Sequence, residues 1–165
     1  MNIILTGFQG VGKSYFGKKV ADQLQRPFFD VDQELIKKHQ ATSVRALYQE
    51  FGKERFRNEE ALCVAELFSH QNSVIALGGG SLSHTLCQAQ VKTGGTLIYL
   101  ALPFHILKTR LLAKNLPAFL ENIDAFDELY RQREPVFATL CASKIELENL
   151  QEDEIIERII ACGCK

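Results

Sequence analysis

A glycine-rich stretch near the start of the chain, Gly7 to Ser14, has the spacing G-x-x-x-x-G-K-[ST] of a phosphate-binding loop. A short apolar run over 2–6 precedes it and a helical apolar pattern follows it, which is the context that this motif requires. Backbone N–H groups and the positive end of the helix dipole would then point at phosphate oxygens. Lys13 would reach the β- and γ-phosphates of a nucleotide, and the hydroxyl of Ser14 would bind Mg²⁺. A chance match in a glycine-bearing turn is the alternative, which the agreement between motif and context disfavours.

Two carboxylates, Asp30 and Asp32, follow the second β-like segment in the run Phe29-Asp30-Val31-Asp32. If the strand continues through them, residues two apart share a face and both carboxylates point the same way. One could hold Mg²⁺ directly or through water, and the other could accept the proton of a substrate hydroxyl. The alternative is that Asp32 caps the next helix. Their place directly after a phosphate-binding unit favours the chemical role.

The segment Gly52 to Glu60 opens a further helix and places Arg57 and Glu60 three residues apart, on one helical face. Arg57 could form a two-pronged contact with a substrate carboxylate while Glu60 fixes its guanidinium. An ordinary surface ion pair has the same spacing. The local sequence does not choose between these interpretations.

Three consecutive glycines, Gly78 to Gly80, come directly after the apolar run 73–77. Glycines after a buried strand let the backbone approach a ligand closely, with N–H groups free to donate. The alternative, a tight strand-to-helix turn, rarely needs three of them.

The elements that must position these residues alternate along the chain. The pattern predicts strands near 2–6, 27–31, 73–77, 96–100 and 144–148. It predicts helices near 13–25, 32–39, 43–51, 54–70, 84–91, 104–113, 121–133 and 152–161. This alternation indicates an α/β fold, a three-layer α/β/α arrangement around a five-stranded parallel sheet, with ligands beyond the carboxyl ends of the strands.

Composition narrows the classes of function. The 165 residues are 46% hydrophobic and 24% charged with a net charge of -1, as in a single ordinary globular domain without the basic surface of a nucleic-acid-binding protein. No apolar run is long enough to span a membrane, and the first strand begins too early for a signal peptide, so we expect a cytoplasmic protein. The five cysteines and four histidines have neither disulfide-framework nor zinc-site spacing. The pair Cys162 and Cys164 suits reduced thiols better than a metal or redox site.

These motifs together resemble the shikimate kinase family. The family order of phosphate loop, D-x-D, G-x-x-x-F-R-x-x-E, G-G-G and R-E-P-[LV]-[YF] is met here by Gly7–Ser14, Asp30/Asp32, Gly52–Glu60, Gly78–Gly80 and Arg133–Phe137. The resemblance covers essentially residues 1–165 as one domain. It implies a mobile lid at about 112–122, a substrate-binding helical segment at about 32–60, and a monomer.

The resemblance implies transfer of the γ-phosphoryl group of ATP to the 3-hydroxyl of shikimate, in the route to chorismate and aromatic amino acids, with Mg²⁺ as cofactor. By position, the nucleotide would be bound by Gly10, Val11, Gly12, Lys13, Ser14, Tyr15 and Arg110, and Mg²⁺ by Ser14 and Asp30. Shikimate would be bound by Asp32, Arg57, Gly79, Gly80 and Arg133, with Glu60 steadying Arg57 and with Tyr48 and Phe56 lining the substrate pocket. Lys13 and Asp32 would be the catalytic residues, with Asp32 as base or orienter of the reacting hydroxyl.

Two segments depart from the family pattern. In the lid, Leu116 stands where an arginine that reaches the transferring phosphate is expected. We hypothesise that Lys114 partly replaces that arginine; a solvated lysine is the alternative. The loop 148–151 lacks the expected proline beside adenine, and Leu150 would form that wall instead.

Four other functions also use a phosphate-binding loop of this kind. A gluconate kinase of the same fold is disfavoured by F-R-x-x-E together with G-G-G. A nucleoside monophosphate kinase should show more basic side chains for a second phosphate, and a GTP-dependent switch needs an N-K-x-D segment, which does not occur. A degenerate kinase that binds ATP without turnover is disfavoured because the reactive side chains are all present.

Overall fold

The computed structural model describes residues 1–113 and 124–164. Within them the strands are β1 (Asn2–Thr6), β2 (Phe28–Asp30), β3 (Val74–Ala76), β4 (Gly95–Ala101) and β5 (Ser143–Glu146). The helices are α1 (Lys13–Leu24), α2 (Val31–Lys38), α3 (Val44–Ser69), α4 (Thr85–Gly94), α5 (Phe104–Leu112), α6 (Asp124–Leu140) and α7 (Glu152–Gly163), with a short 3₁₀ turn η1 (Ser81–Ser83). Lys114, Leu116 and most of the predicted lid lie outside the described residues.

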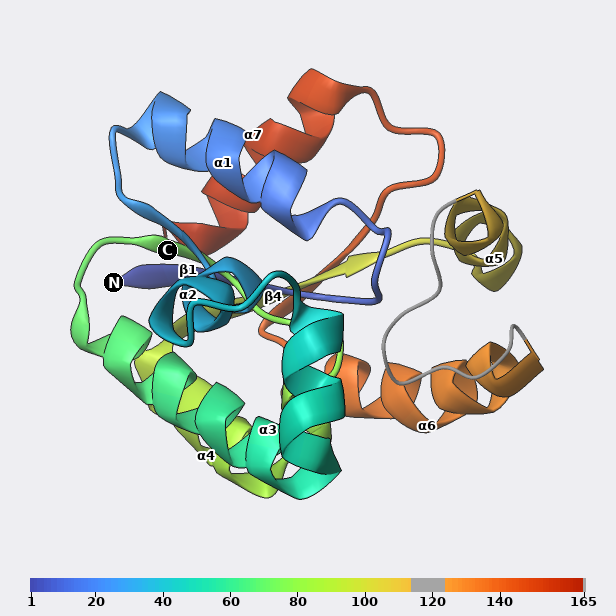
Figure 1. The fold of residues 1–165 in the computed structure, drawn as a ribbon. Coiled ribbons are helices and arrows are strands. Elements are labelled where there is room, and N and C mark those ends of the chain that lie inside the picture. Colours follow the sequence, from blue (N-terminus) through green and yellow to red (C-terminus); the bar gives the residue numbers. More distant parts are fainter. Residues whose placement is uncertain (114–123, 165) are drawn as a thin grey trace.

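The strands form one parallel sheet in the order β2-β3-β1-β4-β5. Helices α1 and α7 cover one face, and α3, α4 and α6 lie on the other, so the predicted three-layer α/β/α fold is confirmed (Figure 1). Strand β1 is central: β3 and β2 lie on one side of it, and β4 and β5 lie on the other. The chain therefore changes direction across β1, which leaves a crevice at the carboxyl ends of the central strands, where such sheets bind ligands.

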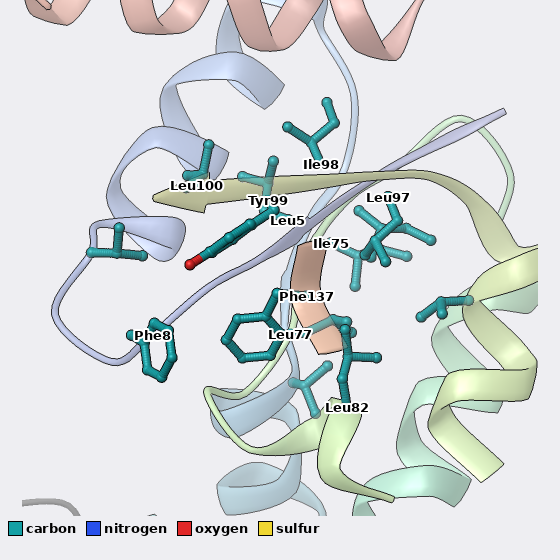
Figure 2. Close-up of a cluster of buried hydrophobic side chains, with 14 of the residues drawn as sticks. Leu5, Phe8, Ile75, Leu77, Leu82, Leu97, Ile98, Tyr99, Leu100 and Phe137 are labelled. Carbon is teal, nitrogen blue, oxygen red and sulfur yellow. The ribbon is translucent and has the colours of Figure 1, made fainter. Parts of the chain in front are cut away.

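The core lies between the sheet and both helical layers. All five residues of β1 are buried, as expected for a central strand that is covered on both faces. Figure 2 shows Tyr99 of β4 and Phe137 of α6 pointing into the space under the sheet, near Phe8 and Leu77. The apolar core thus extends to the loops that follow β1 and β3 and gives both a rigid base.

The backbone of α3 breaks at Gly52, where φ is 73° and ψ is 170°. The two predicted helices on either side of this point are therefore confirmed, although they follow each other without a loop. Few residues other than glycine adopt a positive φ readily. The break sets the direction of the second half of α3, which carries Arg57 and Glu60.

Helix α6 differs most from its prediction. The sequence pattern predicted a helix over 121–133, ending before Pro135, whereas the described helix continues to Leu140. A proline inside a helix removes one hydrogen bond and crowds the preceding turn. Phe137, which is 1% exposed, is part of the core, and its burial compensates for that loss.

None of the helices in the described part of the chain is long and apolar enough to cross a membrane. The five cysteines, all described, are free thiols.

Candidate active site

Lys13 lies at the start of α1, at the end of the glycine-rich loop. Its amine donates hydrogen bonds to the backbone oxygens of Gly7 (2.8 Å) and Phe8 (3.1 Å). Burial lowers the pKa of Lys13 to about 8, and the carboxylates of Asp32 and Asp30 oppose that shift. The amine is therefore held at the loop, close to both carboxylates.

The two aspartates do not share a strand, and that prediction is wrong. Strand β2 ends at Asp30, and Asp32 lies in the first turn of α2. Oδ1 of Asp30 accepts hydrogen bonds from the backbone N–H groups of Asp32 (3.0 Å) and Gln33 (3.3 Å), so Asp30 is the N-cap of α2. Capping was the alternative that the sequence raised for Asp32, and it belongs to Asp30.

The turn nevertheless brings the predicted groups together. A cavity of about 310 Å³ is lined by residues of the glycine-rich loop, both aspartates and the end of β3: Gln9, Gly10, Gly12, Lys13, Ser14, Tyr15, Asp30, Asp32, Leu77 and Gly79. The pKa of Asp32 is raised to about 7 by burial and by the carboxylates of Glu60 and Asp30, against the opposing effect of Lys13 and Arg57. Asp32 can thus exchange a proton near neutral pH.

Ser14 and Asp30 offer oxygen ligands side by side, because the hydroxyl of Ser14 donates to Oδ2 of Asp30. Mg²⁺ prefers oxygen ligands and keeps several waters while it also binds phosphate. The described residues include no group of three or more histidine, cysteine or acidic side chains that could hold a metal by themselves. This donor set fits an ion shared with a nucleotide rather than an all-protein metal site.

A second cavity of about 370 Å³ opens between α3, η1 and α6. Its lining consists of Tyr48, Lys53, Arg57, Leu82, Ser83, Gln88, Leu129, Gln132, Arg133, Val136 and Phe137. Three of these side chains are cationic and none is acidic, which favours an anionic ligand. Tyr48 lines this cavity. Phe56 does not: it is buried and packs edge-on against Tyr48, with ring centroids 5.4 Å apart.

The pair of Arg57 and Glu60 is buried, so the surface-pair interpretation is wrong. Nη1 of Arg57 lies 2.5 Å from Oε2 of Glu60, whose side chain is 1% exposed. The hydroxyl of Ser81 donates to the other oxygen, Oε1, at 2.7 Å. Both carboxylate oxygens are therefore occupied, which satisfies a charge that would be costly to bury alone.

Arg133 joins the two cavities. Its Nη1 donates to the backbone oxygen of Gly79 at 3.0 Å, and it lines the cationic cavity. Burial and the nearby charge of Arg57 lower the pKa of Arg133 to about 10. Gly80 is the point of closest approach, because a Cβ there would lie 2.2 Å from Nη2 of Arg57. The expected close backbone approach at the glycines is thus made to an arginine.

Aromatic packing fixes the glycine-rich loop relative to α6. The ring of Phe8 stacks on Tyr130 with centroids 4.6 Å apart and contacts Phe137 edge-on at 5.0 Å. Since Arg133 lies between these two residues on α6, the packing sets its distance from the loop.

A third cavity, of about 630 Å³, lies beside the loop on the side of α7. It is lined by Gly10, Val11, Gly12, Tyr15, Phe16, Leu102, Arg110, Ala113, Leu147, Leu150, Glu152 and Ile155. Arg110 donates to the backbone oxygen of Gly10 at 3.0 Å, and Leu150 forms part of the wall of this cavity. The size and largely apolar lining suit a nucleoside.

The sequence analysis missed residues that line these cavities or bind residues that do. Glu152 was not among the predicted site residues, yet it accepts hydrogen bonds from Tyr15 (2.5 Å) and Lys19 (2.7 Å) at the edge of the third cavity. Lys53 and Ser81 were not singled out. Lys53 lies within the Gly52–Glu60 segment and Ser81 directly follows the three glycines, which was the only available signal.

The comparisons with known proteins agree with this geometry. A family model described as shikimate kinase matches residues 9–163. The chain belongs to the shikimate kinase family. The shikimate kinase of Bacillus pumilus is 33% identical over 96% of this chain and 87% of its own, and that of Caldanaerobacter subterraneus is 35% identical over 99% and 96%. A solved structure of shikimate kinase from Acinetobacter baumannii in complex with shikimate has a TM-score of 0.88 at 29% identity, covering 96% of this chain and 90% of that one.

Membership in the shikimate kinase family settles the class of reaction. The protein is an ATP-dependent kinase that phosphorylates shikimate, a step of aromatic amino acid biosynthesis. The gluconate kinase, nucleoside monophosphate kinase and GTPase alternatives are set aside by the same findings.

Proposed function

We propose that the three cavities divide the reaction between them: the nucleoside occupies the 630 Å³ cavity, the phosphates the 310 Å³ cavity, and shikimate the 370 Å³ cavity. The observation that carries this division is the acceptor cavity, which has three cationic lining residues and no acidic one. It meets the phosphate cavity at Gly79, whose backbone oxygen binds Arg133.

On the nucleotide side, the backbone from Gly10 to Tyr15 holds the phosphates, and Arg110 packs on the adenine. The buried amine of Lys13 leaves its two backbone acceptors and stabilises the charge that develops on the transferring group. Ser14 and Asp30 would hold Mg²⁺, which when bound neutralises phosphate charge. Phosphoryl transfer asks the protein mainly for positioning and charge stabilisation.

On the acceptor side, Arg57 and Arg133 bind the carboxylate of shikimate, while Glu60 holds Arg57 in place and the backbone of Gly79 and Gly80 contacts the ring. A fork of N–H donors from two arginines matches a planar carboxylate. Tyr48 forms a wall of the same cavity.

Asp32 accepts the proton of the 3-hydroxyl, or orients that hydroxyl, as it attacks the γ-phosphorus. It lies where the phosphate cavity and the charges of Glu60 and Arg57 meet. A pKa of about 7 is well matched to general-base catalysis at neutral pH.

We propose in addition that the enzyme works as a cytoplasmic monomer, as one domain with a lid at about 112–122 over the substrate-binding segment 32–60. Within the lid, Lys114 would partly supply the cationic contact expected at Leu116. Lys114→Ala tests this point: kcat should fall several-fold, and an unchanged kcat would exclude the role.

The overall proposal is tested by ADP release with Mg²⁺-ATP and four conditions: shikimate, gluconate, a nucleoside monophosphate, or no acceptor. We expect turnover with shikimate alone and a 3-phosphate product by phosphorus NMR. ATP binding without shikimate-dependent ADP release would contradict the proposal.

A further inference from the structure

Glu60 is held from two sides by groups of different elements. Arg57, one turn earlier on α3, binds Oε2, and Ser81 of η1 binds Oε1. The side chain of Ser81 is wholly buried, and Ser81 does not line the acceptor cavity. Its hydroxyl therefore reaches the substrate-binding machinery only through another residue.

Gly78, in the loop just after β3, leaves room for this arrangement because it has no side chain. A Cβ on Gly78 would lie 2.6 Å from Oε1 of Glu60, 2.8 Å from Oδ1 of Asp32 and 3.1 Å from Oγ of Ser81. These three side chains thus converge on one bare glycine. The backbone at Gly80 likewise packs closely against the guanidinium of Arg57, since a Cβ there would lie 2.2 Å from Nη2. The space around the Arg57–Glu60 pair is so tight that a rotation of either group needs a neighbour to move.

We propose that Ser81 is a positioning residue of the acceptor site: its hydroxyl fixes the carboxylate of Glu60, which in turn fixes the guanidinium of Arg57 in the orientation that receives the acceptor carboxylate. The inference rests on the proposed function of Arg57. Without the hydroxyl, Oε1 of Glu60 is buried and lacks that hydrogen-bond donor. Rotation of the carboxylate toward a different donor then becomes energetically favourable. Arg57 then loses its fixed partner geometry.

The first test is Ser81→Ala, with Ser69→Ala as matched control. Ser69 lies on α3 far along the helix, is exposed, and donates its hydroxyl to a backbone oxygen (2.6 Å). We expect the KM for shikimate to rise about tenfold in Ser81→Ala, since hydrogen bonds to charged groups contribute that much. The KM for ATP should stay within about twofold, and Ser69→Ala should match the wild type. An unchanged KM for shikimate, or an equal rise in both KM values, overturns the proposal.

A double-mutant cycle with Glu60→Gln separates positioning from direct contact. If Ser81 acts through Glu60, Ser81→Ala adds little to the KM for shikimate once Glu60 has been replaced. Additive effects overturn the proposal. Should Ser81→Ala fail to fold, Ser81→Cys keeps the volume with a much weaker donor, and a rise in the KM for shikimate of smaller size is expected; a wild-type KM there overturns it.

A crystal structure of Ser81→Ala, or of Ser81→Cys if the alanine variant fails to fold, gives a readout that needs no turnover. The carboxylate of Glu60 should rotate from its position against η1 and the guanidinium of Arg57 should move with it; unmoved side chains overturn the proposal. Shikimate-dependent ADP release by the wild type, measured in the same series, tests the proposed function separately.

Discussion

The acceptor side and the nucleotide side of this molecule are built by opposite means. On the proposed acceptor side, the polar groups are buried side chains from three elements: Arg57 of α3 and Ser81 of η1 both bind Glu60, and Arg133 of α6 binds the backbone of Gly79. On the nucleotide side, apart from Lys13, the side chains Tyr15, Arg110 and Glu152 are exposed, and the backbone of the glycine-rich loop forms the inner wall. Because buried charges are weakly screened and exposed charges are strongly screened, single substitutions on the acceptor side should change substrate binding more than those on the nucleotide side.

The fixed acceptor side also has less freedom to relax. Removal of one partner of a buried ion pair leaves the other without compensation, which is strongly destabilising, whereas an exposed partner is rehydrated. We therefore expect acceptor-side variants to change binding of shikimate sharply and nucleotide-side variants to change binding of ATP mildly.

The largest effect is expected at Asp32, where the two sides meet. Asp32→Asn keeps the shape but removes the proton acceptor, so kcat should fall by about 10² to 10⁴ with little change in either KM. Steady-state ADP release measures this, and Asp22→Asn, on the exposed end of α1, is the control. Full kcat in Asp32→Asn would exclude both of its proposed roles.

The next largest effect is expected at Arg57, which we propose binds the carboxylate of shikimate. Arg57→Lys retains a positive charge but loses the guanidinium fork, which binds Glu60 and by our proposal also binds the shikimate carboxylate. The KM for shikimate should rise about 10- to 100-fold while the KM for ATP stays constant. Arg55→Lys, two residues earlier with its guanidinium 4.0 Å from the ring centroid of Phe51, should leave both constants unchanged. A similar loss in both variants would show that α3, not the fork, is responsible.

On the nucleotide side, Arg110→Ala should raise the KM for ATP by only about threefold to tenfold, because the side chain is exposed and makes one hydrogen bond to Gly10. The KM for shikimate should not move. A rise in the KM for ATP larger than the rise in the KM for shikimate in Arg57→Lys would contradict the expectation that the acceptor side is the more sensitive one.

The smallest effect is expected at Lys53, the exposed cation of the acceptor cavity, for which the described residues provide no ion-pair partner. Lys53→Gln should raise the KM for shikimate about twofold to threefold at low salt, and added salt should abolish the difference. Lys18→Gln, an exposed lysine of α1, serves as control. A salt-independent effect would mean that Lys53 makes a direct, buried contact.

The sequence predicted the order of the elements well because buried parallel strands and amphipathic helices leave strong periodic patterns. It also predicted that Lys13, Ser14 and the two aspartates lie near one another, since each group follows a strand of one parallel sheet and the carboxyl ends of those strands share an edge. It misplaced Asp32 because the end of β2 is decided by the capping bond of Asp30, a single side-chain contact that no pattern reveals. Pro135 marked a false helix end for a similar reason, because burial of Phe137 outweighs local preference.

Residues that act across elements were the hardest to predict. Ser81 contacts Glu60 over a separation of 21 residues, and Glu152 contacts Tyr15 over 137. Phe56 was assigned to the cavity wall with Tyr48, but the direction of α3 after Gly52 buries it behind Tyr48 instead. Such contacts depend on tertiary packing, which local spacing does not record.

A crystal structure of this enzyme with shikimate and a nonhydrolysable ATP analogue would test the assignment of the acceptor cavity directly. We predict the shikimate carboxylate between Arg57 and Arg133, the 3-hydroxyl hydrogen-bonded to Asp32, and the triphosphate along the backbone from Gly10 to Tyr15. Shikimate bound with its carboxylate away from both arginines, or with another hydroxyl facing Asp32, would contradict the assignment of the acceptor cavity.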